Sequence, residues 1–255
     1  MKSYIRKIAK SPLGVKFRNL TGWRSVPISF AHLQKNASVS DGFIWRVDEH
    51  FTTKFNFANL LPLFINSNDN TIILEFFDHL HQPIKTITLE NLVDVSQEII
   101  IDSMLLNTVG YGSFYIYHTS SSTLQESITF SNRCYVGYSY QKNLYSNMHG
   151  NTYVKSKGIN NDKIEGNIIQ FSGIRKYQYK LQNSFNGFDK TELVFVNPHN
   201  YTVKMRLNDL KYRLSPYEVK VIDFKDDIAT IRGQSYFLRP IVFNYLNGHI
   251  DVYHS

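Results

Sequence analysis

Cysteine is almost absent from this chain of 255 residues, in which Cys134 is the single example. One thiol cannot form an intramolecular disulfide, and it cannot supply the thiolate cluster of a structural zinc site. Nothing in the sequence therefore requires an oxidising compartment. We expect no cofactor and no bound metal.

Long hydrophobic runs are missing as well. The basic N-terminal sequence "MKSYIRKIAK" is not followed by the apolar segment of a signal peptide. No stretch approaches the roughly 20 apolar residues of a membrane helix. We therefore expect a cytoplasmic protein without a membrane span, while noting that leaderless export leaves no trace in a sequence.

Two common catalytic signatures are also lacking. The chain contains neither the G-x-S-x-G nucleophile elbow nor the G-x-x-x-x-G-K-[ST] phosphate loop. Their absence argues against the usual hydrolase and nucleotide-binding folds. Helical periodicity is equally scarce, and the sequence predicts only short helices, near residues 3–9 and in "ANLLPLF" (58–64), where Pro62 limits the length.

Alternation of apolar and polar residues dominates from about residue 41 onward and predicts β-strands. Turn residues at 66–70, 81–83, 197–200 and 246–248 separate these segments at short intervals. Such spacing is typical of all-β sandwiches and barrels. The clearest strand patterns are "TIILEFFD" (71–78), "PIKTITLE" (83–90), "GSFYIYH" (112–118) and "YEVKVIDF" (217–224).

Two parts of the chain resemble each other. Residues 74–102 align with 193–223 with small gaps, and 112–118 align with 248–254 without gaps. A duplication would give two related antiparallel β-sandwich units, Ig-like or jelly-roll-like. The alternative is that any two hairpins of alternating pattern align to some extent. The predicted domains are a basic extension (1–40), a first unit (41–130), a polar aromatic connector (131–165) and a second unit (166–255).

The net charge of +7 is unevenly distributed. Residues 1–24 contain seven Lys and Arg residues and no acid, whereas 25–128 are acidic on balance. A basic arm of this kind can contact phosphate groups of nucleic acid or a membrane surface. We interpret it instead as a solvated extension, because it lacks a dense polybasic block.

The connector is rich in Tyr, Ser, Asn and Gly, the residues that antibody loops use for binding. Tyrosine rings can pack on sugar rings while amides and an arginine bond the hydroxyls. We therefore predict binding of a carbohydrate or similar small polar ligand here. The alternative is a buried seam without a ligand. The predicted ligand-binding residues are Arg133, Tyr135, Tyr138, Tyr140, His149 and Asn151.

Cys134 and the histidines of "DHLH" are interpreted as structural residues. Period two places Cys134 on the apolar face of its segment, which favours a buried thiol over a nucleophile paired with His149. In "DHLH" (78–81), His79 and His81 could ligate a metal with Asp78, but the segment falls at a predicted turn.

Residues 40–55 contain a second patterned segment. Phe43 and Trp45 share one face of it, which predicts core packing. Arg46 and Asp48 lie on the other face, where we expect an exposed ion pair worth at most about 1 kcal/mol.

Three functions remain open from the sequence. The first is non-catalytic or accessory binding of a carbohydrate, as in surface polysaccharide metabolism. The second is an enzyme acting on a sugar or acyl substrate, with His149 as general base and Arg133 as an anion clamp. The third is a structural subunit of a homo-oligomeric assembly. Nucleic acid is not an expected partner.

Overall fold

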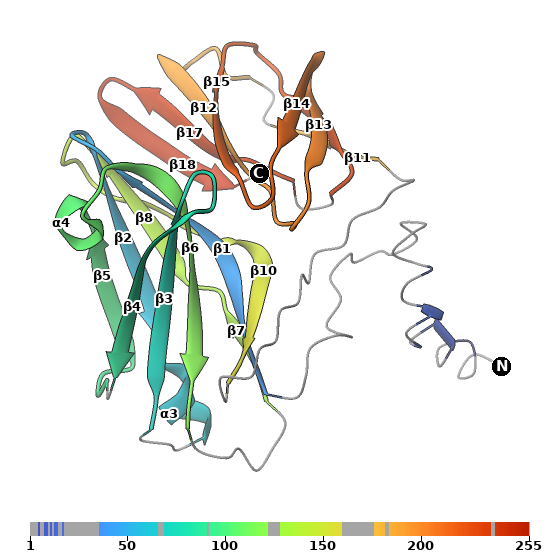
Figure 1. Cartoon of the computed structure of the whole chain (residues 1–255). Helices are drawn as coiled ribbons and strands as arrows, with labels where there is room; N and C mark the ends of the chain where they lie inside the picture. The colour runs from blue at the N-terminus through green and yellow to red at the C-terminus, as the bar shows by residue number, and fades with distance from the viewer. Residues whose placement is uncertain are drawn as a thin grey trace.

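The computed structural model shows an all-β protein built from small sheets, as Figure 1 shows. It describes residues 36–65, 69–90, 92–121, 128–159, 176–181, 184–235 and 238–254, without the side chains of 152–154, and a few isolated positions in residues 1–17. Four sheets account for the strands of this part of the chain. All pairs are antiparallel except that of β1 with β7. The all-β prediction is confirmed.

Residues 36–159 form the first and second sheets. The first sheet has the order β10 (Asn151–Gly158), β1 (Ala37–Val47), β6 (Gly110–Thr119), β3 (Thr71–Asp78) and β4 (Pro83–Glu90), with β7 (Thr129–Asn132) paired to β1. The second sheet has the order β5 (Ser96–Ile101), β2 (Phe51–Ala58), β8 (Tyr135–Tyr140) and β9 (Ser146–His149).

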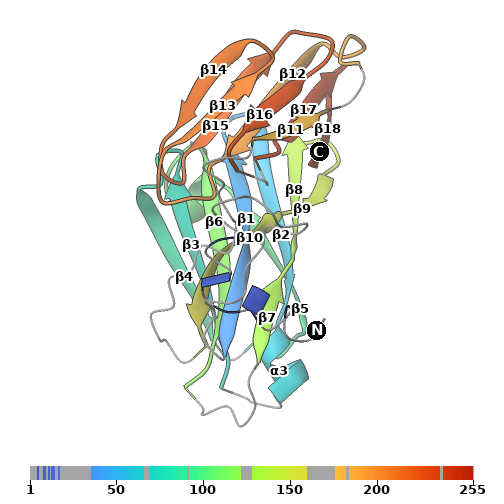
Figure 2. The ribbon, with the colours of Figure 1, turned by 90° about the vertical axis from the view of Figure 1, so that its right-hand side faces the viewer.

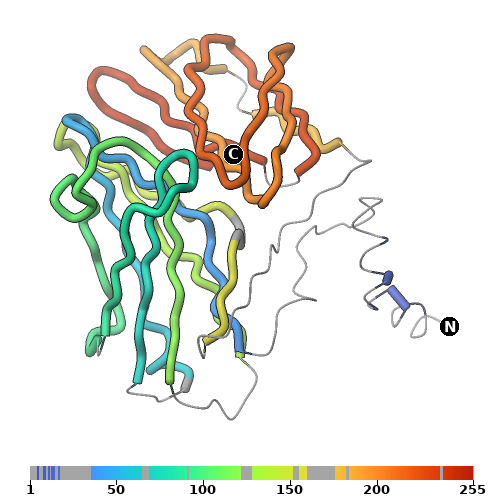
Figure 3. Tube along the Cα trace, viewed as in Figure 1, coloured from blue at the N-terminus to red at the C-terminus, as the bar shows by residue number. Residues whose placement is uncertain are grey.

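Residues 176–254 form the other two sheets, which gather at one end of the molecule (Figures 2 and 3). The third sheet has the order β15 (Val219–Phe224), β12 (Lys190–Val196), β17 (Ile241–Leu246) and β18 (His249–His254). The fourth sheet has the order β11 (Tyr177–Lys180), β16 (Thr230–Gly233), β13 (Val203–Leu207) and β14 (Leu210–Leu214).

Only short helices accompany the sheets. The helix predicted in "ANLLPLF" is confirmed as α3 (Leu60–Ile65), where Pro62 lies within the first turn and so removes no intrahelical hydrogen bond. A second helix, α4 (Ser103–Leu106), is capped by the Asp102 carboxylate. Neither described helix has the length and apolar character needed to cross a membrane. The helix expected at residues 3–9 lies largely outside the described residues.

The third sheet is apolar on both faces. Val194 and Phe243 point into a large core that they share with the first and second sheets. Their neighbours Leu193, Phe195 and Val242 point the other way, into a smaller core shared with the fourth sheet. Strands buried on both faces have continuous apolar runs, such as "LVFV" (193–196) in β12. Because the large core spans three sheets, the structure does not confirm a simple pair of separate sandwiches.

The internal similarity does not correspond to equivalent strand pairing. In the first aligned stretch, β3 pairs directly with β4 and β6. In the second stretch, the corresponding strand β12 pairs with β15 and β17, while β13 joins another sheet. The aligned stretches therefore share an alternating pattern and not a common hydrogen-bond topology.

A charged cluster lies where the third sheet meets the first two, with Arg46 in β1 of the first sheet. Arg46 Nη1 lies 2.5 Å from Glu192 Oε2, and the Tyr245 hydroxyl donates to the same oxygen at 2.6 Å. The Arg46 guanidinium also lies 4.0 Å from the centre of the Phe51 ring. Arg46 Nε is 3.9 Å from Asp48 Oδ2, so the expected pair is present but loose, and its arginine is mostly buried instead of exposed. The close partner of Arg46 is Glu192, which is 146 residues away in sequence.

This cluster lowers the pKa of Glu192. Burial alone raises that pKa, but the hydrogen bond and charge of Arg46, with hydrogen bonds from Lys190 and Tyr245, outweigh burial and bring it to about 2. The folded-state pKa is thus below the ordinary value of 4.5. Stability contributed by the ionised carboxylate is therefore complete above pH 4.5 and is lost as the pH falls toward 2.

We predict that Glu192→Gln lowers the free energy of unfolding by about 3 kcal/mol at pH 7, because it leaves the Arg46 charge without its buried partner. The variant should also lose stability less steeply between pH 4.5 and pH 2 than the unaltered chain. Urea unfolding at several pH values measures the free energy of unfolding and its dependence on pH. The control is Glu98→Gln, which removes an exposed partner of Lys54 and should cost less than about 1 kcal/mol. Equal losses of unfolding free energy in the two variants would contradict the role of Glu192 as the buried partner of Arg46.

Candidate functional site

The described part of the predicted connector (131–159) belongs to the sheets, and its residues 160–165 lie outside the described residues. Residues 129–158 contribute β7 and β10 to the first sheet and β8 and β9 to the second. β8 lies between β2 and β9, so its backbone is paired on both sides. The predicted ligand-binding residues are therefore placed by strand pairing, and their side chains point to different surroundings.

Three of these residues lie near one another on an exposed surface. Tyr135 and His149 face each other across β8 and β9, with their ring centres 4.3 Å apart. The Tyr135 side chain is half exposed. Arg133 is also half exposed, and its Nε lies 3.6 Å from the buried carboxylate of Asp41.

His254 of β18 joins this group, with its ring centre 6.4 Å from that of His149. Burial lowers the pKa of His254, and the charges of Arg239, His149 and Arg133 lower it further. We call Arg133, Tyr135, His149 and His254 the Tyr135 surface. A groove of about 320 Å³ lies beside it, lined in part by Asn56, Ser96 and Arg133.

Tyr138 requires a correction, because it is a packing residue, while Tyr140 is partly buried beside it. Tyr138 is fully buried, and its hydroxyl donates to the Ile44 carbonyl at 2.9 Å. Burial raises the pKa of Tyr138 well above its ordinary value, although the Arg46 charge opposes this. Tyr140 packs between Phe51 and Tyr245, with ring centres 5.0 and 5.3 Å away. Both tyrosines therefore help to join the second and third sheets.

Asn151 belongs to a different sheet from Tyr135 and His149, although it follows His149 by two residues. It opens β10, pairs with Gly42 of β1 and is partly buried. Its backbone thus belongs to the first sheet, whereas Tyr135 and His149 belong to the second. The structure places Asn151 as part of a strand pair in the first sheet.

Cys134 is buried, as the alternation predicts. Burial raises the pKa of its thiol well above the ordinary value, and the nearby Asp41 charge adds to this shift. The thiol therefore stays protonated at neutral pH and is a poor nucleophile. Its packing, and not a pairing with His149, accounts for its position.

The "DHLH" turn holds no metal-binding arrangement. Within the described ranges, no group of three or more His, Cys, Asp or Glu side chains could hold an ion. The His81 ring stacks on Phe77 at 4.0 Å, and its Nε2 is 2.7 Å from the Lys155 ammonium. Burial and the Lys155 charge lower the pKa of His81 to about 4. The Lys155 ammonium donates this hydrogen bond, and Nε2 of the neutral His81 ring accepts it.

A second site, which the sequence analysis missed, lies on the outer face of the fourth sheet. In "VKMRL" and "LKYRL", apolar side chains such as Val203, Met205 and Leu214 point into the small core. Alternation then directs the intervening residues to solvent. These outward residues are Lys204 and Arg206 of β13 and Lys211 and Arg213 of β14, and all four are exposed.

Strand pairing aligns these cations in rows. Arg206 lies opposite Lys211 of β14 on one side and opposite Arg232 of β16 on the other. Lys204 lies opposite Arg213 in the next row. Neighbouring strands are about 4.8 Å apart, and residues i and i+2 are about 7 Å apart, so these side chains form a two-dimensional grid of positive charge.

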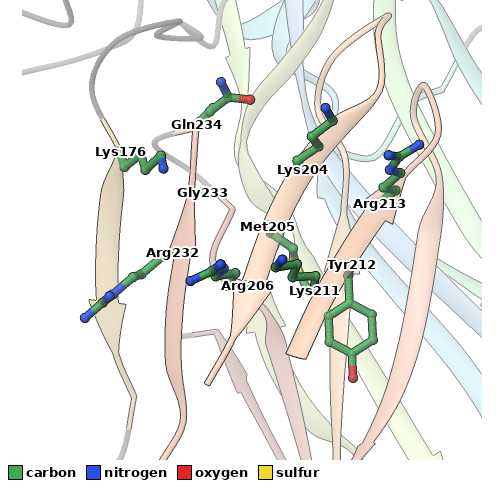
Figure 4. A pocket seen from close by; sticks show the side chains of 10 residues that line it. All are labelled: Lys176, Lys204, Met205, Arg206, Lys211, Tyr212, Arg213, Arg232, Gly233 and Gln234. Carbon is green, nitrogen blue, oxygen red and sulfur yellow. The ribbon is translucent and has the colours of Figure 1, made fainter. Parts of the chain in front are cut away.

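This grid surrounds a hollow of about 620 Å³, and Figure 4 shows its side chains. We call the six cations that line the hollow the basic face. They are Lys176, Lys204, Arg206, Lys211, Arg213 and Arg232. The backbone of Gly233 contributes to the same hollow, as does Gln234.

The basic face contains no compensating acid. The strand sequences "YQYK", "TIRG", "VKMRL" and "LKYRL" include neither Asp nor Glu. Among the residues that the structure describes, none of the six cations forms an ion pair. Like charges placed directly opposite each other destabilise a sheet, so this arrangement costs stability that packing elsewhere must offset.

Comparison with known proteins identifies no relatives. No protein-family model matches the chain, and no curated protein matches it. Among solved structures, the major pilin T-13 of Streptococcus pyogenes is 11% identical, over 87% of this chain and 97% of that chain, with a TM-score of 0.20. Another major pilin structure from Streptococcus pyogenes is 8% identical over 81% of both chains, with a TM-score of 0.18. Similarity this weak carries no argument about fold or function.

Proposed function

We propose that this chain is a non-catalytic binding protein for an anionic polymer, which it contacts through the basic face. The supporting observation is the grid of six exposed cations without a single carboxylate in the strands that carry it. A surface that only needed to stay soluble would mix both signs of charge. Clustered positive charge that lowers stability is expected where it serves binding.

The chemistry of the hollow favours holding an anion over transforming it. Its described lining provides ammonium, guanidinium, phenol and amide groups, with no carboxylate, imidazole or thiol. Lysine and arginine donate hydrogen bonds to phosphate, sulfate or carboxylate oxygens, and arginine does so in a bidentate manner. General acid and base catalysis is most often carried out by His, Asp or Glu side chains, and none of these is among the residues that line the hollow.

We predict that Lys204→Gln together with Lys211→Gln weakens retention on a phosphocellulose column, so that the variant elutes at lower salt than the unaltered chain. Each substitution removes one cation from the grid, and binding to a polyanion weakens with every lost charge contact. Lys204 and Lys211 each face an arginine across the β13–β14 pair. The substitutions therefore remove repulsion between like charges, and the melting temperature should not fall.

The control is Lys85→Gln with Lys142→Gln, which removes the same charge from exposed positions outside the fourth sheet. A basic chain binds a cation exchanger through any cation, so only the difference between the two pairs is informative. If both pairs lower the elution salt equally, the basic face has no special role.

A second candidate function is glycan binding at the Tyr135 surface. The half-exposed Tyr135 ring, held against His149, offers a flat apolar platform beside the Arg133 guanidinium. Sugars bind such platforms through ring packing, with their hydroxyls bonded to neighbouring polar groups. This keeps the predicted carbohydrate site at Arg133, Tyr135 and His149 and omits the buried Tyr138 and the partly buried Tyr140.

For this candidate we predict that Tyr135→Ala lowers glycan-array signals and leaves the melting temperature nearly unchanged. Tyr138→Phe should lower the melting temperature and leave the glycan-array signals unchanged. It removes a buried hydrogen bond to Ile44, at a cost of about 1–2 kcal/mol, and leaves the exposed Tyr135 platform intact. Array signals that are absent from the unaltered chain, or that survive Tyr135→Ala, would rule out the second candidate.

A further inference from the structure

The chemistry of the basic face narrows the choice of anionic polymer. Lys and Arg side chains donate hydrogen bonds and accept none. A polysaccharide presents hydroxyl donors as well as acceptors. The six cations accept no hydrogen bonds, and the side chains lining the hollow offer those donors few acceptors, chiefly the Tyr212 hydroxyl and the Gln234 amide oxygen. The phosphodiester backbone of a nucleic acid duplex presents acceptor oxygens along its outer surface. A face made mostly of donors is therefore best matched by a duplex backbone.

Charge density points to the same partner. The cations of β16, β13 and β14 span two strand spacings, which is about 10 Å. Duplex DNA carries one charge per roughly 1.7 Å of its axis, so 10 Å of duplex carries about six phosphates. The sheet reaches the phosphates on the side of the duplex that faces it, where both strands contribute, whereas a single strand contributes one row. The grid has five cations in this span, and they are Lys204, Arg206, Lys211, Arg213 and Arg232.

The face also lacks the features that other nucleic acid contacts need. Single strands stack their bases on exposed aromatic rings. On the described part of the fourth sheet, Tyr179 and Tyr212 are partly buried against the small core, and Tyr212 is the one aromatic side chain that lines the hollow. Four strands extend over about 14 Å, which is wider than the 12 Å major groove. The sheet therefore contacts the backbone and does not read base edges.

We infer that the polymer bound by the basic face is double-stranded nucleic acid, held through its phosphates without sequence preference. This inference rests on the proposed function and replaces the expectation from sequence that nucleic acid is not a partner. Arg206, which lies between Lys211 and Arg232 in the central row, is at the middle of the contact.

The test is a fluorescence titration of the full chain with a 20-base-pair DNA duplex at several salt concentrations. About five phosphate contacts predict a slope of log affinity against log salt near −4.5. Arg206→Gln with Arg232→Gln should reduce the slope by about two units and weaken binding on the order of tenfold per residue at 0.1 M salt. Two duplexes of unrelated sequence should bind equally, and Lys85→Gln with Lys142→Gln should have a smaller effect.

Parallel titrations use the single strand, heparin and polygalacturonate. Binding to heparin or polygalacturonate without binding to the duplex would overturn this inference and leave the proposed function standing, provided that Arg206→Gln with Arg232→Gln weakens it. Tighter binding of the single strand would also overturn it. Duplex binding that ignores the Arg206 and Arg232 substitutions would place the contact elsewhere, as on residues 1–24. Binding to none of the four polymers would overturn both the inference and the proposed function.

Discussion

The burial of the third sheet on both faces is the constraint on which the rest of the structure depends. β12 alternates Leu193 and Phe195 on one face with Val194 and Val196 on the other, and every one of these side chains is buried. Such a sheet must be covered twice to keep its apolar surface from water. The first two sheets cover one side and the fourth sheet covers the other. Glu192, which opens the same run, is buried at the seam and is held there by Arg46.

This arrangement determines what the fourth sheet can display. Only one of its faces packs on the small core, so its outer side chains have no structural partner within the described residues. Solubility alone would be met by a mixture of Lys and Glu on such a face. The strands instead place cation opposite cation, as with Arg206 between Lys211 and Arg232. Repulsion between these cations lowers the stability of the fold. An anionic ligand that neutralises them would remove that repulsion and stabilise the folded state, which is why we assign the face to ligand binding.

Local patterns in the sequence predicted much of the fold. "TIILEFFD" and "PIKTITLE" coincide with β3 and β4, because alternation depends only on which neighbours share a face. Pairings between distant residues were not predictable. Tyr138 resembles an exposed binding residue in composition, and its burial follows from packing against Phe243. Arg46 was assigned to Asp48 because no local signal points to Glu192. The sequence "VKMRLNDLKYRL" alternates apolar and basic residues, which is a signal for a positively charged sheet face. The same residues lie in the stretch that aligns with 74–102, and the alignment favours a duplication instead.

The most direct test of the central claim is lysine footprinting by acetylation and mass spectrometry, with and without duplex DNA. Lys204 and Lys211 should become protected at saturating duplex, while Lys85 and Lys142, which are exposed outside the fourth sheet, should react at unchanged rates. Protection of Lys85 and Lys142 to the same extent would indicate unspecific coating of a basic protein. Unchanged reactivity of Lys204 and Lys211 in the presence of bound duplex would contradict the account.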